Sequence, residues 1–236
     1  MNIAKENTVA SIVAENINAA HVFKKYGIDF CCGGGVSLEK ACEKKNVDFS
    51  LLVKDLSEIE APKKAYNYDS WKPDFLVDHI ENVHHTYVEE NIPLILQYSN
   101  KVARVHGEHH PEVIKINQLF LAAAQELSAH LKKEELILFP YIKKLVQANE
   151  QGVKPPTPHF GTVNNPITMM HEEHEDVGDV FKEIAQLTNN YTPPEGACNT
   201  FKALYAKLEE FEQDLHQHIH LENNILFPKA IALEKM

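Results

Sequence analysis

HLKKE at residues 130–134 and HIHLE at residues 218–222 decide the fold of this chain, because they are two copies of one pattern. Ile137-Leu138-Phe139-Pro140 follows the first copy and Ile225-Leu226-Phe227-Pro228 follows the second. Each matching residue lies 88 positions later in the second copy. A repeat of this kind indicates two similar helical hairpins that combine in one pseudo-symmetric bundle.

The spacing within each copy places a histidine and a glutamate on one side of a helix. Residues four positions apart in an α-helix lie one turn from each other on the same face. His130 with Glu134, and His218 with Glu222, can therefore direct four metal-ligating groups toward one level between two helices. Solvated histidines on helix faces are the plain alternative, which the repetition disfavours.

Long amphipathic helices are expected around both copies. Apolar spacing and the intervening polar or proline-rich breaks predict helices over residues 73–105, 112–149, 165–189 and 198–233. Strand-like alternation of useful length does not occur in the sequence, and short connections favour antiparallel hairpins. We therefore expect an all-α protein whose main unit is an antiparallel four-helix bundle. Pro93, Pro140 and Pro228 are expected to kink or end their helices.

Two further histidines reach the level of the repeat in such hairpins. Residues equidistant from the turn of an antiparallel hairpin lie side by side, which pairs His85 with His130 and His174 with His218. Four imidazoles and two carboxylates suit two first-row transition-metal ions, with the carboxylates bridging them. The expected ligands are His85, His130, Glu134, His174, His218 and Glu222.

The number and type of these ligands favour iron over zinc. Structural zinc takes four tetrahedral ligands and catalytic zinc usually takes three from the protein, whereas mixed nitrogen and oxygen ligands in a bundle suit a di-iron or di-manganese site. Glu126, Glu173 and Asp214 are either acids that support the ligands or plain surface charges. His106 lies about 30 Å from His85 along a continuous helix, so it is left out of the expected ligands and could join them only if the helix breaks near Pro93.

Composition restricts the class of protein. The chain has 236 residues, and its formal net charge of −11 argues against binding to nucleic acids or to anionic membranes. No apolar run approaches the roughly 18 residues that a transmembrane helix needs. Lys5 and Glu6 lie where a signal peptide would be apolar, so we expect a cytoplasmic protein with reduced thiols.

Charge also divides the chain into two expected domains. Residues 1–65 carry as many lysines as acids, whereas residues 66–236 carry all of the net negative charge. The change falls in a segment that resembles a linker, so we place the boundary between residues 65 and 66. The first domain is expected to be a small three-helix unit, and its core is marginal enough that it should dock on something else. Its helices are expected over residues 8–25, 37–45 and 48–60.

A vicinal cysteine pair lies in a glycine-rich turn of the first domain. Cys31 and Cys32 precede Gly33-Gly34-Gly35, and a disulfide between adjacent residues is strained, so we expect two available thiols. The helix start that follows this turn is expected to lower a thiol pKa. The alternative is a pair of small, partly buried residues at a tight turn. Cys42 and Cys198 are expected in the core.

The two units together resemble a known family. The segment from His21 to Gly34, with Ser37-Leu38 and Ala41-Cys42, is similar to the N-terminal domain of the bacterial iron–sulfur cluster repair di-iron proteins, the ScdA/YtfE group. The second unit is similar to the hemerythrin-like domain of the same proteins, on residues 101–107, 130–140 and 221–228. The resemblance covers nearly the whole chain and shows no departure at the matching ligand positions.

The resemblance implies a cytoplasmic stress protein that restores iron–sulfur clusters damaged by nitric oxide or peroxide. It implies two non-haem iron ions bridged by an oxo group and by the carboxylates of Glu134 and Glu222. It also implies iron donation or nitric oxide handling as the mechanism. In the family a histidine matching His106 is also counted as a candidate ligand, with which the helix geometry disagrees. The implied partners are damaged iron–sulfur proteins or apo-scaffold proteins, nitric oxide or O2 as small ligands, and a second copy of the chain in a homodimer.

Three functions stay open at this stage. In cluster repair, the Cys31-Cys32 turn would receive iron or a nitrosyl group, or contact the damaged client. A nitric oxide reductase would use the two irons and leave the thiols a structural role. A hemerythrin-like sensor of O2 or nitric oxide, or an iron store, would bind reversibly, although the sequence shows no attached DNA-binding or signalling domain.

Overall fold

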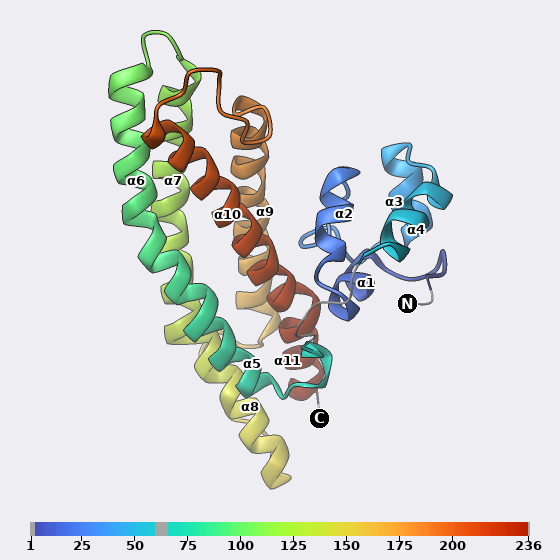
Figure 1. The fold of residues 1–236 in the computed structure, drawn as a ribbon. Coiled ribbons are helices and arrows are strands. Elements are labelled where there is room, and N and C mark those ends of the chain that lie inside the picture. The colour runs from blue at the N-terminus through green and yellow to red at the C-terminus, as the bar shows by residue number, and fades with distance from the viewer. Residues whose placement is uncertain (1–2, 60–65, 236) are drawn as a thin grey trace.

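Helices are the regular elements of the computed structural model, which describes residues 3–59 and 66–235. The expected all-α class is therefore confirmed. Figure 1 shows the short N-terminal helices beside the long helices of a bundle. The domain boundary expected between residues 65 and 66 falls beside residues 60–65, which lie outside the described residues, so it stays a prediction.

Between residues 3 and 59, the N-terminal unit contains four short helices rather than three. Its helices are α1 (Val9–Glu15), α2 (Ala19–Lys25), α3 (Leu38–Lys45) and α4 (Phe49–Ser57). Thr8, Ser37 and Asp48 cap α1, α3 and α4 as expected. The helix expected over residues 8–25 is interrupted because Asn16 has an extended backbone and its side chain accepts a hydrogen bond from the backbone N–H of Asn18.

Within the described residues, the bundle has the four long rods that the sequence predicts, and π-helical turns interrupt three of them. Figure 1 shows these rods side by side. The first rod consists of α5 (Pro73–His79), η2 (Ile80–His85) and α6 (Thr86–His106), and the second of α7 (Glu112–Lys133), η3 (Glu134–Leu138) and α8 (Phe139–Gln151). The third is α9 (Asn164–Leu187). The fourth consists of α10 (Asn199–Leu221), η4 (Glu222–Leu226) and α11 (Phe227–Glu234).

The interruptions η2, η3 and η4 are wide, π-helical turns. Such turns contain one residue more than an α-helical turn and recur at functional sites. Pro140 and Pro228 follow two of them and occupy the first turn of α8 and α11. α6 continues through Pro93, so this proline does not end its helix. This residue is exposed, so water can satisfy the carbonyl that its missing N–H would have bonded.

Two separate apolar cores fill the described part of the bundle, one on each side of the wide turns. The larger core joins α6, α7, α10 and most of α9, with Phe120, Phe181 and Phe211 at its centre. The smaller core joins α5, α8, α11 and the start of α9 around Phe139 and Phe227. The layer between the two cores is polar, and it contains the residues that the sequence analysis selects as metal ligands.

The N-terminal unit packs on α10 and continues the larger core. Its buried Phe23 and Phe30 belong to the same apolar cluster as residues of the bundle, and the ring of Phe30 lies edge-on to His216. The ammonium group of Lys24 pairs with the carboxylate of Glu212, which is only 3% exposed. The small unit therefore completes its core against the bundle.

Candidate metal centre

The structure brings all six predicted ligands together in the polar layer. Each of them is at most 3% exposed. The wide turns supply the two glutamates and one histidine, and regular α-helix supplies the other three histidines. The six residues are His85 on η2, His130 on α7, Glu134 on η3, His174 on α9, His218 on α10 and Glu222 on η4.

The six residues form two groups that share both carboxylates. His85 and His218 belong to the first group with Glu134 and Glu222, and His130 and His174 belong to the second with the same two glutamates. Within each group the candidate ligand atoms lie within 4.8 Å of one another. This arrangement offers two neighbouring cation positions with two shared carboxylates.

Each glutamate spans both groups. Oε2 of Glu134 lies 3.4 Å from Nε2 of His85 and 3.4 Å from Nε2 of His130. Oε1 of Glu222 lies 2.9 Å from Nε2 of His218, while its Oε2 lies 3.2 Å from Nε2 of His174. A carboxylate that reaches one histidine of each group has the position of a bridging ligand.

His130 and His174 face each other in a way that requires a proton or a cation between them. Their Nε2 atoms lie 3.1 Å apart. Nδ1 of His130 lies 2.8 Å from a carboxylate oxygen of Glu173, and Nδ1 of His174 lies 2.9 Å from Oδ1 of Asn223. Because these partners accept hydrogen bonds from Nδ1–H, the neutral rings direct the lone pairs of both Nε2 atoms toward the same point.

Several buried polar atoms of the centre have no hydrogen-bond partner among the described residues. They are Nε2 of His85, both carboxylate oxygens of Glu134 and Oε2 of Glu222. Burial of an unpaired carboxylate is costly, and a coordinated cation removes that cost. The four imidazoles and two carboxylates therefore fit two transition-metal ions by their chemistry as well as by their placement.

The pKa values of the predicted ligands are consistent with a cation site. Burial alone would raise the pKa of Glu222, but His218 and His174 hold that pKa well below its ordinary value. Burial lowers the pKa of His218, which leaves its ring neutral. Burial alone would lower the pKa of His130, but Glu134 and Glu222 outweigh burial and raise it to about 9. A positive charge is thus stabilised between the two carboxylates.

Outer partners orient three of the four imidazoles. His85 contacts Glu135 through Nδ1 at 3.0 Å, in addition to the contacts of His130 with Glu173 and of His174 with Asn223. Sequence reasoning found Glu173 but missed Glu135 and Asn223. The repeat itself was the available signal, because each of these two residues directly follows a predicted bridging glutamate.

The fourth imidazole, that of His218, packs against the ring of another histidine. The ring of His218 stacks on that of His84 at a centroid distance of 5.5 Å, and Nδ1 of His84 lies 2.9 Å from a carboxylate oxygen of Asp214. Of the three acids expected to support the ligands, the structure thus brings two, Glu173 and Asp214, to the centre. Glu126 is exposed, in agreement with the alternative that it is a surface charge.

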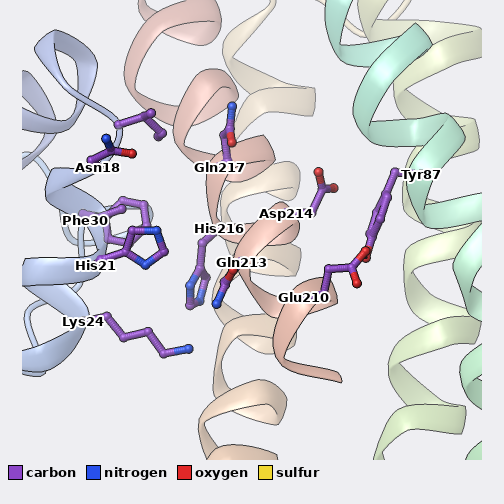
Figure 2. Close-up of a pocket in the computed structure, with 12 residues that line it drawn as sticks. Asn18, His21, Lys24, Phe30, Tyr87, Glu210, Gln213, Asp214, His216 and Gln217 are labelled. Atoms are coloured by element: carbon purple, nitrogen blue, oxygen red, sulfur yellow. The ribbon is translucent and has the colours of Figure 1, made fainter. Parts of the chain in front are cut away.

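A cleft between the N-terminal unit and the bundle leads toward this side of the centre. Figure 2 shows His21 and Lys24 of α2 facing His216 of α10 across it. Asp214 also lines the cleft and contacts His84, which stacks on His218. Asp214 is therefore the lining residue that connects this cleft, through His84, to a predicted ligand.

His106 lies far from the predicted ligands, at the end of α6. Its Nε2 lies 3.2 Å from Sγ of Cys198, and its ring packs edge-on against Phe201. Twenty-one residues of α6 separate this position from His85, which corresponds to about 30 Å. Cys198 is exposed, so the expectation of a core position was wrong for it, whereas Cys42 is buried as expected.

The vicinal cysteines lie side by side as free thiols in the turn before α3. Their Sγ atoms are 3.8 Å apart, and Sγ of Cys31 lies 3.3 Å from Oδ1 of Asp29. The contact with Cys32 and burial raise the pKa of Cys31 well above its ordinary value. The expectation that the following helix would lower a thiol pKa is therefore wrong for Cys31, because its neighbours and its burial dominate.

Comparisons with known proteins agree with this two-part organisation. The model of a domain of unknown function, DUF542 (the ScdA N-terminal domain), matches residues 5–60, and the hemerythrin HHE cation binding domain matches residues 76–230. A probable iron–sulfur cluster repair protein of Haemophilus influenzae is 38% identical over 216 residues, which cover 90% of this chain and 91% of that protein. The iron–sulfur cluster repair protein YtfE of Yersinia pseudotuberculosis is 37% identical over 92% of each chain.

Within the residues that the structure describes, none of the helices has the length and apolar character needed to cross a membrane.

Proposed function

Because this chain belongs to the family of iron–sulfur cluster repair proteins with an ScdA-type N-terminal domain and a hemerythrin cation-binding domain, we propose that it repairs damaged iron–sulfur clusters with two iron ions held in its bundle. The damage in question is nitrosative or oxidative, and the clients are damaged iron–sulfur proteins or apo-scaffold proteins. A cytoplasmic location and a homodimer belong to the same proposal.

The observation that carries this proposal is the pair of four-residue groups with shared carboxylates. His85 and His218 would hold one iron ion, His130 and His174 would hold the other, and Glu134 and Glu222 would bridge them. When bound, iron supplies exchangeable metal and coordination positions for a small ligand such as nitric oxide or O2.

The protein's own groups prepare the centre for this role. Glu135, Glu173 and Asn223 fix the rings of His85, His130 and His174 so that Nε2 of each points inward. The two apolar cores above and below exclude water from the layer. Because ligands must remain deprotonated, protonation of these histidines and glutamates releases the metal.

The proposal is tested by removing both bridging carboxylates. We expect the double variant Glu134→Leu/Glu222→Leu to lose its iron after anaerobic reconstitution, and with it the repair of a nitric-oxide-damaged cluster protein. The matched control is Glu126→Leu/Glu172→Leu, which changes two exposed glutamates on the ligand-bearing helices α7 and α9. Metal analysis and Mössbauer spectroscopy measure the iron, and wild-type iron content in the first variant would refute the assignment.

A nitric oxide reductase is the second candidate. Each group offers four protein ligands, so an octahedral ion there keeps positions for a substrate. Replacement of Cys31 and Cys32 distinguishes this function from cluster repair. If Cys31→Ala/Cys32→Ala protein, supplied with a reductant, produces nitrous oxide at the wild-type rate but no longer repairs clusters, then reduction does not account for repair. If both activities persist, the thiols have no part in either.

A further inference from the structure

We propose that Asp29, Cys31 and Cys32 form a separate binding site for one thiophilic divalent transition-metal ion. One candidate ligand atom from each residue lies within 4.8 Å of the other two. All three residues belong to the N-terminal unit, so this site shares no ligand with the predicted di-iron centre. That the ion in question is iron in transit rests on the proposed function, whereas the site itself rests on the geometry that follows.

Two of the three distances between the candidate ligand atoms match the edges of a metal tetrahedron, and the third is at most 4.8 Å. For metal–sulfur bonds of about 2.3 Å and a metal–oxygen bond of about 2.0 Å, tetrahedral geometry requires about 3.8 Å between sulfurs and about 3.5 Å between sulfur and oxygen. The Sγ atoms of Cys31 and Cys32 lie 3.8 Å apart, and Sγ of Cys31 lies 3.3 Å from Oδ1 of Asp29. An ion can therefore enter with little movement of these groups.

The turn is held in this shape before any ion binds. Oδ1 of Asp29 accepts hydrogen bonds from the backbone N–H groups of Cys31 and Cys32, at 3.0 and 3.1 Å. Nδ2 of Asn224, on η4, donates to the carbonyl oxygen of Cys31 at 3.0 Å. Gly34 permits the close packing of the turn, since a Cβ atom there would lie 2.3 Å from the carbonyl oxygen of Phe30. Pre-organisation of this kind lowers the cost of binding.

Charge and exposure favour a site that exchanges its ion. The negative charge of two thiolates and a carboxylate exceeds the positive charge of a divalent cation. The ammonium group of Lys182 on α9 attracts both Asp29 and Cys32. Cys31 is buried, whereas Cys32 is half-buried. Three protein ligands leave the fourth position of a tetrahedron open, as in sites that exchange a ligand. A thiolate of an acceptor protein can occupy that position.

The site is also mechanically connected to the predicted di-iron centre. Asn224, which holds the carbonyl of Cys31, lies two residues after Glu222 in the same wide turn. A change in the conformation of η4 on release of metal from Glu222 would therefore reach the cysteine turn. In the proposed function this connection makes the turn the point from which iron leaves toward a client.

Cobalt(II) tests the site, because thiolate–cobalt charge-transfer absorption in the near ultraviolet reports sulfur ligands. The predicted di-iron ligands contain no sulfur, so cobalt bound there does not give this band. We expect the full chain, titrated under reducing conditions without oxygen, to develop the band and saturate at one such ion per chain. The Cys31→Ser and Cys32→Ser variants should lose it, and Cys42→Ser and Cys198→Ser should retain it.

Asp29→Asn distinguishes a ligand from a purely structural residue. Asparagine retains the oxygen that accepts the two backbone hydrogen bonds but lacks the carboxylate charge. We expect the variant to keep its circular dichroism spectrum and to bind cobalt at least about tenfold more weakly at the thiolate site. Wild-type affinity in this variant would overturn the three-ligand site, as would the lack of a charge-transfer band in the wild type or its persistence in Cys31→Ser/Cys32→Ser protein.

The outcome is separable from that of the proposed function. A charge-transfer band together with failure of the chain to repair clusters would establish the site and refute iron in transit as its cargo. Repair activity without a band would refute the site and leave the di-iron proposal standing.

Discussion

Glu173 accepts a hydrogen bond from Nδ1 of His130 at 2.8 Å, while its other carboxylate oxygen pairs with the ammonium group of Lys133. His130 and Lys133 both belong to α7, whereas Glu173 belongs to α9. The contact thus crosses between two helices and fixes the orientation of one predicted ligand through a residue that does not touch the metal position.

The variant Glu173→Gln tests this orientation. Loss of the charged acceptor should weaken metal binding about 10–100-fold, the range seen when outer partners of ligating histidines are replaced. Metal content after dialysis against a series of chelator concentrations measures the effect. Glu172→Gln is the matched control, because Glu172 is the exposed neighbour. Equal retention of metal by both variants would contradict the orienting role.

The division of the histidines into two groups predicts stepwise loss of metal. His174→Ala should lower the content from two ions to about one per chain, because the group of His85 and His218 keeps all four of its ligands. His218→Ala should do the same from the other side. His159→Ala, in the loop before α9, should leave both ions in place. Complete loss of metal in both single variants would show that the two positions do not bind independently.

The tight packing at Gly34 predicts a difference between adjacent glycines. A Cβ atom at Gly34 would lie 2.3 Å from the carbonyl oxygen of Phe30 and 3.0 Å from Cβ of Ala10, whereas none of the described atoms approaches one at Gly35 within 4 Å. Gly34→Ala should therefore lower the free energy of unfolding by about 1–3 kcal/mol, the usual cost of overpacking. Denaturant titration measures it. Gly35→Ala should change it much less, and the opposite order would refute the packing argument.

The ion pair of Lys24 and Glu212 joins the two units, so its loss should lower the free energy of unfolding of the full chain. Lys24→Met keeps an apolar stem but leaves the carboxylate of Glu212 buried without its partner, which should cost about 1–3 kcal/mol. Denaturant unfolding of the full chain measures this cost, and Lys44→Met, at an exposed lysine on α3, is the control. Adding Glu212→Gln should recover most of the loss, so an equally unstable double variant would contradict the explanation.

The grouping of the six candidate ligands could be predicted from the sequence, because four of them repeat at a fixed offset and hairpin geometry is simple. The positions of His85 and His174 opposite His130 and His218 follow from counting residues to each turn. Helix-breaking prolines were less informative. Pro93 has solvent beside it and does not end α6, since the cost of proline depends on whether another group can satisfy the freed carbonyl.

The remaining features depend on contacts that a single sequence does not reveal. The break at Asn16 results from a competition between its side chain and the helix backbone, which apolar spacing cannot detect. The wide turns keep helical spacing on both sides and so look continuous in the sequence. The docking of the N-terminal unit depends on pairs such as Lys24 with Glu212, which lie 188 residues apart.

The polar layer between the two apolar cores has a mechanical consequence. Of the rods that carry the predicted ligands, α9 alone crosses the layer as uninterrupted α-helix, while the others loosen there into η2, η3 and η4. Metal held by the predicted ligands would tie the two halves of the bundle together at this layer. Without metal, the buried carboxylates of Glu134 and Glu222 would repel each other, so we expect the three interrupted rods to loosen at this layer while α9 stays a continuous helix.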